Sequence, residues 1–145
     1  MSTHVLVPLD GSDPAWEALE HAFDRYAGGR ITVLHVVDPA EGVYTGYDGG
    51  YYDSDAFDRA RERGENLCEQ AIERLEERGE DDVTSIETVV ETGRPSRTIV
   101  HYAEEREVDH VVIGSHGRTG VSRILLGSVA ETVLRRAPVP VTIVR

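Results

Sequence analysis

The stretch GSHGRTGVSRILLGS, residues 114–128, decides how the rest of the chain is interpreted. It follows the apolar run Val111–Ile113, which predicts a buried strand, and it precedes a helical pattern that begins at Ser128. Glycines let backbone N–H groups approach a ligand closely, and a helix start offers unpaired N–H donors. The order of strand, glycine-rich loop and helix therefore predicts a site for an anion, although turns in a long connection would also use glycines.

The predicted anion site draws on both ends of this stretch. We expect backbone amides and the Ser128 hydroxyl to hold phosphate oxygens, and Ser128 is also a candidate helix cap. Arg118 either adds positive charge or is solvated. His116 is interpreted as a surface histidine rather than a catalytic one, because no carboxylate is predicted to orient it. The residues assigned to this part of the site are Gly114, Ser115, His116, Gly117, Arg118, Gly127, Ser128 and Val129.

Short apolar runs alternate with helical patterns along the whole chain. The runs cover residues 4–9, 31–37, 83–90, 110–113 and 139–144. Such alternation predicts parallel strands joined by right-handed helical crossovers. We therefore expect a single-domain α/β fold, an open five-stranded parallel sheet of order 3-2-1-4-5 with helices on both faces, similar to a Rossmann fold. The third run alternates between apolar and polar residues, which favours a sheet edge.

In a sheet of this order, the direction of winding reverses between the first and fourth strands, and a crevice opens at their carboxyl ends. The first strand ends at Leu9 and Asp10, and the fourth ends at Gly114. The two loops with the most distinctive residues are thus predicted to meet. Asp10 is suited to accept hydrogen bonds from sugar hydroxyls or a base amino group, or else to help cap the start of the following helix. We expect that helix to begin with Asp13 as its capping residue and Pro14 in its first turn.

Three further motifs accompany the spacing Gly114-x2-Gly117-x9-Gly127-Ser128. They are Val-Pro-Leu-Asp at 7–10, Leu-His-Val-Val-Asp at 34–38 and Pro-Val-Pro-Val-Thr-Ile-Val at 138–144. Together they resemble the ATP-binding branch of the universal stress protein family, over the whole chain.

The resemblance implies one nucleotide-binding domain over residues 1–145 that binds ATP, with or without Mg²⁺. It implies that Asp10 contacts the nucleoside, and that Val36 packs beside adenine or pairs with it through its backbone. Val36 and Pro8 would then form the apolar floor of the site, and Leu9 is assigned to the site beside them. No dedicated metal cage is visible in the sequence, so Mg²⁺ would be held by Asp10 or by phosphate and water alone.

The charge of the chain limits its partners. It has 27 acidic residues and 15 basic ones, all arginine, for a net charge of −12. Because this charge repels nucleic acids and anionic membranes, neither is an expected partner. The absence of lysine, together with the many carboxylates, favours a protein of a high-salt cytosol. The alternative is an ordinary acidic surface, with arginine favoured over lysine by GC-rich codon usage.

Location and assembly follow from smaller signals. The chain has no apolar run of about 18 residues and no signal-peptide pattern, and its single cysteine, Cys68, is typical of a reducing compartment. We therefore expect a cytoplasmic protein. The unprotected apolar strand Val139–Val144 predicts a homodimer through this edge, as the resemblance also implies. The tyrosine-rich segment 43–52 is interpreted either as a lid or partner surface, or as a solvated loop.

Several enzyme classes lack their sequence signatures here. The P-loop and the response-regulator receiver need a lysine that the chain does not have. The dinucleotide fingerprint, the hydrolase elbow and zinc-ligand spacings are also missing. We assign no catalytic residue and predict a small ATP-binding regulatory or stress-response protein. The alternatives are a protein-interaction module of the same fold that does not bind ATP, and a slow ATPase.

Overall fold

A computed structural model describes residues 3–46, 49–79, 84–116 and 126–145. Its main sheet has five strands in the order β5-β2-β1-β6-β7, and every neighbouring pair is parallel. The predicted order 3-2-1-4-5 is therefore confirmed, and so is the edge position of the third strand. The strands are β1 His4–Pro8, β2 Arg30–Val37, β5 Ser85–Thr92, β6 His110–Gly114 and β7 Val141–Val144.

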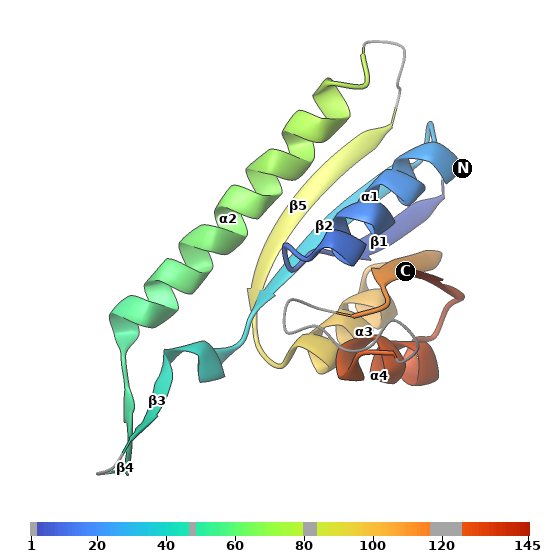
Figure 1. Cartoon of the computed structure of the whole chain (residues 1–145). Helices are drawn as coiled ribbons and strands as arrows, with labels where there is room; N and C mark the ends of the chain where they lie inside the picture. The colour runs from blue at the N-terminus through green and yellow to red at the C-terminus, as the bar shows by residue number, and fades with distance from the viewer. Residues whose placement is uncertain (1–2, 47–48, 80–83, 117–125) are drawn as a thin grey trace.

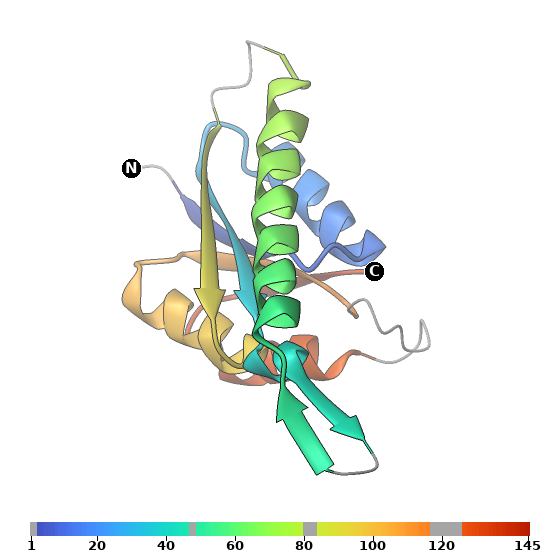
Figure 2. The ribbon, with the colours of Figure 1, turned by 90° about the vertical axis from the view of Figure 1, so that its left-hand side faces the viewer.

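Helices cover both faces of this sheet, as Figures 1 and 2 show. Helices α1 (Asp13–Arg25) and α2 (Ser54–Glu76) pack on one face, around a cluster that includes Phe23 and, from β1, Val5 and Val7. Helices α3 (Pro95–Glu105) and α4 (Ser128–Arg136) pack on the other, around Leu6, Leu34 and Val111. Every β1 residue is buried, as expected of a central strand covered on both faces.

Two predicted helix caps are wrong by one residue. Ser12, not Asp13, caps α1, because its side chain accepts a hydrogen bond from the Ala15 amide. Gly127, not Ser128, is the N-cap of α4, and no side chain caps that helix. Ser128 is the first residue inside α4, so its hydroxyl is not used as a cap.

The predicted loop between β2 and α2 contains regular structure. A 3-10 helix, Pro39–Gly42, is followed by an antiparallel hairpin of β3 (Val43–Gly46) and β4 (Gly49–Tyr52). Figures 1 and 2 show this hairpin projecting beyond the end of the main sheet. Valine, threonine and tyrosine favour extended structure, and this preference outweighs the glycines that suggested an irregular loop.

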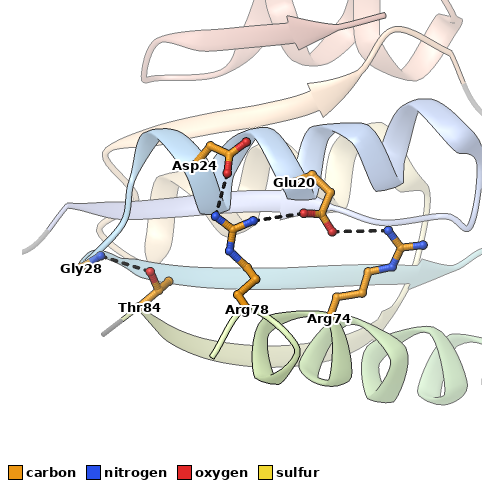
Figure 3. Close-up of polar contacts among 6 residues, drawn as sticks. All are labelled: Glu20, Asp24, Gly28, Arg74, Arg78 and Thr84. Atoms are coloured by element: carbon orange, nitrogen blue, oxygen red, sulfur yellow. Dashed lines mark hydrogen bonds and ion pairs between the residues drawn. The ribbon is translucent and has the colours of Figure 1, made fainter. Parts of the chain in front are cut away.

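A cluster of ion pairs joins α1 to the last turns of α2 (Figure 3). The Arg78 guanidinium lies 2.7 Å from Asp24 and 3.3 Å from Glu20, and Arg74 lies 3.4 Å from Glu20. These charges surround the outer rim of the α1–α2 contact, where they are partly exposed. Within the described ranges, no helix is both long and apolar enough to cross a membrane.

Candidate ligand-binding site

A cavity of about 470 Å³ opens where β1, β2 and β6 end at their carboxyl termini. Its volume lies within the range of small-molecule sites, about 300–1,000 Å³. One wall comes from α3 and another from the first turn of α4. The position is the predicted crevice, where the sheet reverses its direction of winding between β1 and β6.

The loops that follow β1 and β6 meet at this cavity. The Ser12 hydroxyl oxygen lies 3.5 Å from the carbonyl oxygen of His116, across 104 residues of sequence. The Gly127 amide donates a 2.7 Å hydrogen bond to the carbonyl oxygen of Ser115. This bond fixes the start of α4 against the end of β6, so the two ends of the glycine-rich stretch lie together beside the β1 loop.

Asp10 is the acidic group at the centre of the β1 loop. Its Oδ1 atom accepts hydrogen bonds from the Ser12 amide at 2.9 Å and from the Ser12 hydroxyl at 2.6 Å. Ser12 in turn caps α1. Asp10 therefore does not cap α1 itself but holds the residue that does, and it also lines the cavity. Its contact with a ligand stays a prediction.

His35 connects the ends of β1 and β2 beneath the cavity. Its Nδ1 atom lies 2.8 Å from the Leu9 carbonyl oxygen, and because a carbonyl can only accept, Nδ1 carries the proton. The ring is buried against α2, where a Cβ atom on Gly64 would lie 2.3 Å from Cδ2 of His35. Glycine at position 64 therefore makes room for this ring, which in turn holds the Leu9 carbonyl beside Asp10.

Two glycines of the predicted loop are explained by packing. A Cβ atom on Gly114 would lie 2.8 Å from the Ala15 nitrogen and the Pro14 carbonyl carbon. A Cβ atom on Gly127 would lie 3.1 Å from Cα of His116. The absence of a side chain thus lets β6 end against the start of α1, and lets α4 begin against His116. These close approaches shape the cavity whether or not a phosphate enters it.

Nine of the twelve predicted site residues line the cavity, and Ser115 is described but does not line it. Ser115 is buried beneath it, and its hydroxyl lies 3.2 Å from Nδ1 of His116. Gly117 and Arg118 lie outside the described residues. The nine that line the cavity are Pro8, Leu9, Asp10, Val36, Gly114, His116, Gly127, Ser128 and Val129.

Other lining residues were missed by the sequence analysis. Ser12 follows the motif at 7–10 and Asp38 ends the motif at 34–38, so their positions after strand ends were a usable signal. Pro95 and Ile99 come from α3, and only the packing of α3 on the sheet brings them here. The missed residues are Ser12, Ala15, Leu34, His35, Asp38, Pro95, Ile99, Ile113 and Ala130.

The lining is divided between apolar and polar groups. Pro8, Val36, Ile99 and Val129 give apolar surface suited to a flat ring, while Asp10 and the start of α4 give hydrogen-bonding groups. Among the described residues, no three His, Cys, Asp or Glu side chains come together as metal ligands. The division of the lining suits an organic molecule with an apolar ring and polar substituents.

Known proteins of one family match this chain over its full length. The sequence model described as "Universal stress protein family" matches residues 1–145. Universal stress protein MJ0531 of Methanocaldococcus jannaschii is 33% identical over 143 residues, which are 97% of this chain and 81% of that protein. Universal stress protein MJ0577 of the same organism is 32% identical over 159 aligned residues, covering 100% of this chain and 96% of the relative.

Solved structures agree with the sequence matches. The structure of MJ0577 superimposes with a TM-score of 0.81 and 30% identity, over 99% of this chain and 96% of that one. A universal stress protein in complex with cAMP gives a TM-score of 0.68 and 26% identity, over 99% of this chain and 97% of that one. From the family match and these relatives together, the chain belongs to the universal stress protein family.

Proposed function

We propose that this chain is a small cytoplasmic regulatory protein whose 145 residues form one nucleotide-binding domain for ATP. The observation that carries the proposal is the meeting of Asp10 with the Gly127–Ser128 helix start, in one cavity with an apolar floor. The cAMP complex of a structural neighbour supports an adenine nucleotide as the ligand class. Binding of ATP would alter a surface that a regulatory partner or a second copy of the chain contacts.

The division of the lining suggests how the nucleotide lies. Adenine fits the apolar floor of Pro8, Leu9 and Val36, and the Asp10 carboxylate would accept hydrogen bonds from the ribose. The phosphates fit at the start of α4, where no side chain caps the helix and its first amides are open to an anion. Gly117 and Arg118 would extend this phosphate site along the rest of the loop.

Mg²⁺ would enter the site with the phosphates. Asp10 offers one carboxylate near them, and the remaining ligands would be phosphate oxygens and water, which suits an ion that keeps several waters. We assign no catalytic role to His116, because the contact recorded for its ring is the Ser115 hydroxyl at 3.2 Å rather than a carboxylate. Nucleotide occupancy, rather than turnover, is therefore the proposed output.

We also propose a homodimer through the β7 edge, within the predicted segment Val139–Val144. β7 is the last strand of the main sheet, and its four residues are half-buried. The carbonyls of Pro140 and Val144 accept hydrogen bonds from the amides of Val111 and Ser115, so Val141 and Ile143 direct their backbone groups away from β6. An antiparallel β7 from a second copy would satisfy these groups.

A calorimetric titration of ATP into nucleotide-free protein tests the proposed site. Wild type is expected to bind one ATP per chain. Gly127→Val should weaken binding at least about tenfold, because the new side chain fills space between His116 and the α4 start. Leu126→Val is the control, since Leu126 is 38% exposed and does not line the cavity.

Three outcomes of this titration are informative. Normal ATP binding by a folded Gly127→Val protein would contradict the placement of the site. Failure of wild type to bind ATP would favour the protein-interaction alternative. ADP that accumulates beyond one equivalent, and that is abolished by Asp10→Ala, would favour the slow ATPase.

A further inference from the structure

A second groove, of about 340 Å³, lies between α3 and α4, the two helices packed on one face of the sheet (Figure 1). It shares no lining residue with the cavity described above, so a ligand in one does not occupy the other. Its lining is mostly charged or polar. The residues that line it are Arg94, Ser96, Arg97, Val100, His101, Glu104, Thr132 and Arg136.

Three exposed arginines give this groove a local charge opposite to that of the protein. Arg94 and Arg97 lie at the start of α3, and Arg136 lies in the last turn of α4. Glu104 is the acidic residue of the lining, seven positions from Arg97 and thus about two helical turns away. A concentration of arginine in a chain with a net charge of −12 makes this groove a local exception to the acidic surface.

The groove arginines also differ from others in their pairing. Arg94, Arg97 and Arg136 make no ion pair with any residue in the described parts of the chain. Five arginines elsewhere on the described surface do pair with carboxylates. Those five are Arg30, Arg61, Arg74, Arg78 and Arg135. Carboxylates are therefore abundant on this protein, yet the three groove guanidiniums have no carboxylate partner among the described residues.

Neutral donors complete the arrangement around the arginines. The side chains of Ser96 and Thr132 contribute hydroxyls from opposite helices. Arg94 is the N-cap of α3 and makes no side-chain cap, so the amides of Ser96 and Arg97 at the helix start are not capped by a side chain. Guanidiniums, hydroxyls and amide N–H groups are together the donor set that proteins use for phosphate oxygens.

We propose that the α3–α4 groove is a second ligand site, which binds a small molecule through a pyrophosphate group. Guanidiniums line the groove from both helices, and two linked phosphates offer them more acceptor oxygens than one phosphate does. These charge-assisted contacts have to offset the repulsion that a protein of net charge −12 exerts on an anion. A pyrophosphate group is also small enough for a groove of about 340 Å³.

The groove is tested by titrating inorganic pyrophosphate into the ¹⁵N-labelled protein. Binding is measured from the chemical shifts of the backbone amides. The titration is run on nucleotide-free protein, because ATP itself carries linked phosphates and would compete with the probe for the groove. Saturable shifts are expected at Ser96, Arg97 and Thr132, larger than those at Gly114 and Ser128. The amide positions separate the two sites, so the result stands even where ATP fails to bind.

Matched substitutions give the second readout. Arg97→Gln and Arg136→Gln should each weaken pyrophosphate binding about tenfold, because each removes a charged hydrogen-bond donor. Arg61→Gln on α2 removes the same charge far from the groove, and should change binding less than twofold. All three side chains are exposed, so the variants should keep the fold, which circular dichroism checks.

The opposite pattern would overturn the proposal. It fails where pyrophosphate causes no saturable shift at the groove amides, or where Arg97→Gln and Arg136→Gln bind it as tightly as wild type. It also fails where Arg61→Gln weakens binding as much as they do, because the effect would then be general electrostatics.

Discussion

The Oδ1 atom of Asp10 accepts two hydrogen bonds from Ser12, one from its amide at 2.9 Å and one from its hydroxyl at 2.6 Å. Both bonds use the same carboxylate oxygen. Asp10 therefore holds the turn into α1 with one oxygen, and Oδ2 makes no hydrogen bond recorded for the described residues. Because Asp10 lines the cavity, we infer that Oδ2 is the atom that a ligand hydroxyl would reach.

Asp10→Asn separates these two roles. The amide oxygen of asparagine can keep the bonds from Ser12, while its NH₂ group replaces an acceptor with a donor. ATP affinity should fall about tenfold or more, with little change in melting temperature. Asp13→Asn is the matched control, since Asp13 is exposed and does not line the cavity. Equal ATP affinity in Asp10→Asn and wild type would exclude the proposed ribose contact.

Gly114→Ala tests the packing explanation for the first glycine of the loop. Its Cβ atom would lie 2.8 Å from backbone atoms of Pro14 and Ala15, which cannot move as a side-chain end could. We expect a loss of stability of about 1–3 kcal/mol, or several degrees in melting temperature. Gly127→Ala should cost less, because its nearest contact is 3.1 Å and its φ of −66° suits any residue. An unchanged melting temperature in Gly114→Ala would contradict this account.

The sheet order and the position of the crevice were predictable because both depend on chain order and short apolar runs. Val5 to Val7 and Val111 to Ile113 are apolar without interruption, as strands buried on both faces require. Once the order of strands is known, the ends of the first and fourth strands must be neighbours. The order of the strands alone therefore predicts that Asp10 and Gly114 lie close together.

The rest of the site could not be predicted because it depends on distant packing. His35 faces Gly64 of α2, and no local pattern relates a strand histidine to a glycine 29 positions later. Ile99 reaches the cavity only through the angle at which α3 lies on the sheet. The sequence predicts that Gly114 lets a ligand approach the backbone closely. In the structure, the atoms nearest to a Cβ built on Gly114 belong to Pro14 and Ala15 of α1.

The melting temperature is expected to rise as KCl is increased from low to molar concentration. Exposed ion pairs such as Arg78 with Asp24 weaken in salt, but each is worth at most about 1 kcal/mol. Salt also screens the repulsion among the excess acidic side chains of this protein of net charge −12. This second term is the larger one, so the melting temperature should rise. Differential scanning fluorimetry across KCl concentrations checks this. A melting temperature that is flat or falls up to molar salt would contradict the proposed salt adaptation.

Val141→Pro is expected to convert the proposed dimer to a monomer. The Val141 amide points away from β6, so its loss leaves the main sheet bonded but removes a donor from the open edge. Val141→Ala is the control for the lost side chain, because it keeps the amide. Sedimentation at micromolar concentration should give dimers for wild type and Val141→Ala, and monomers for Val141→Pro. A monomeric wild type would rule out the β7 interface.

The central claim, that this chain is an adenine-nucleotide-binding member of its family, is tested most directly by the nucleotide it retains on purification. The protein is purified in high KCl, denatured and filtered, and the filtrate is identified by chromatography and mass. We expect close to one adenine nucleotide per chain, with ATP the main species. An empty protein that also fails to bind added ATP in a titration would contradict the claim.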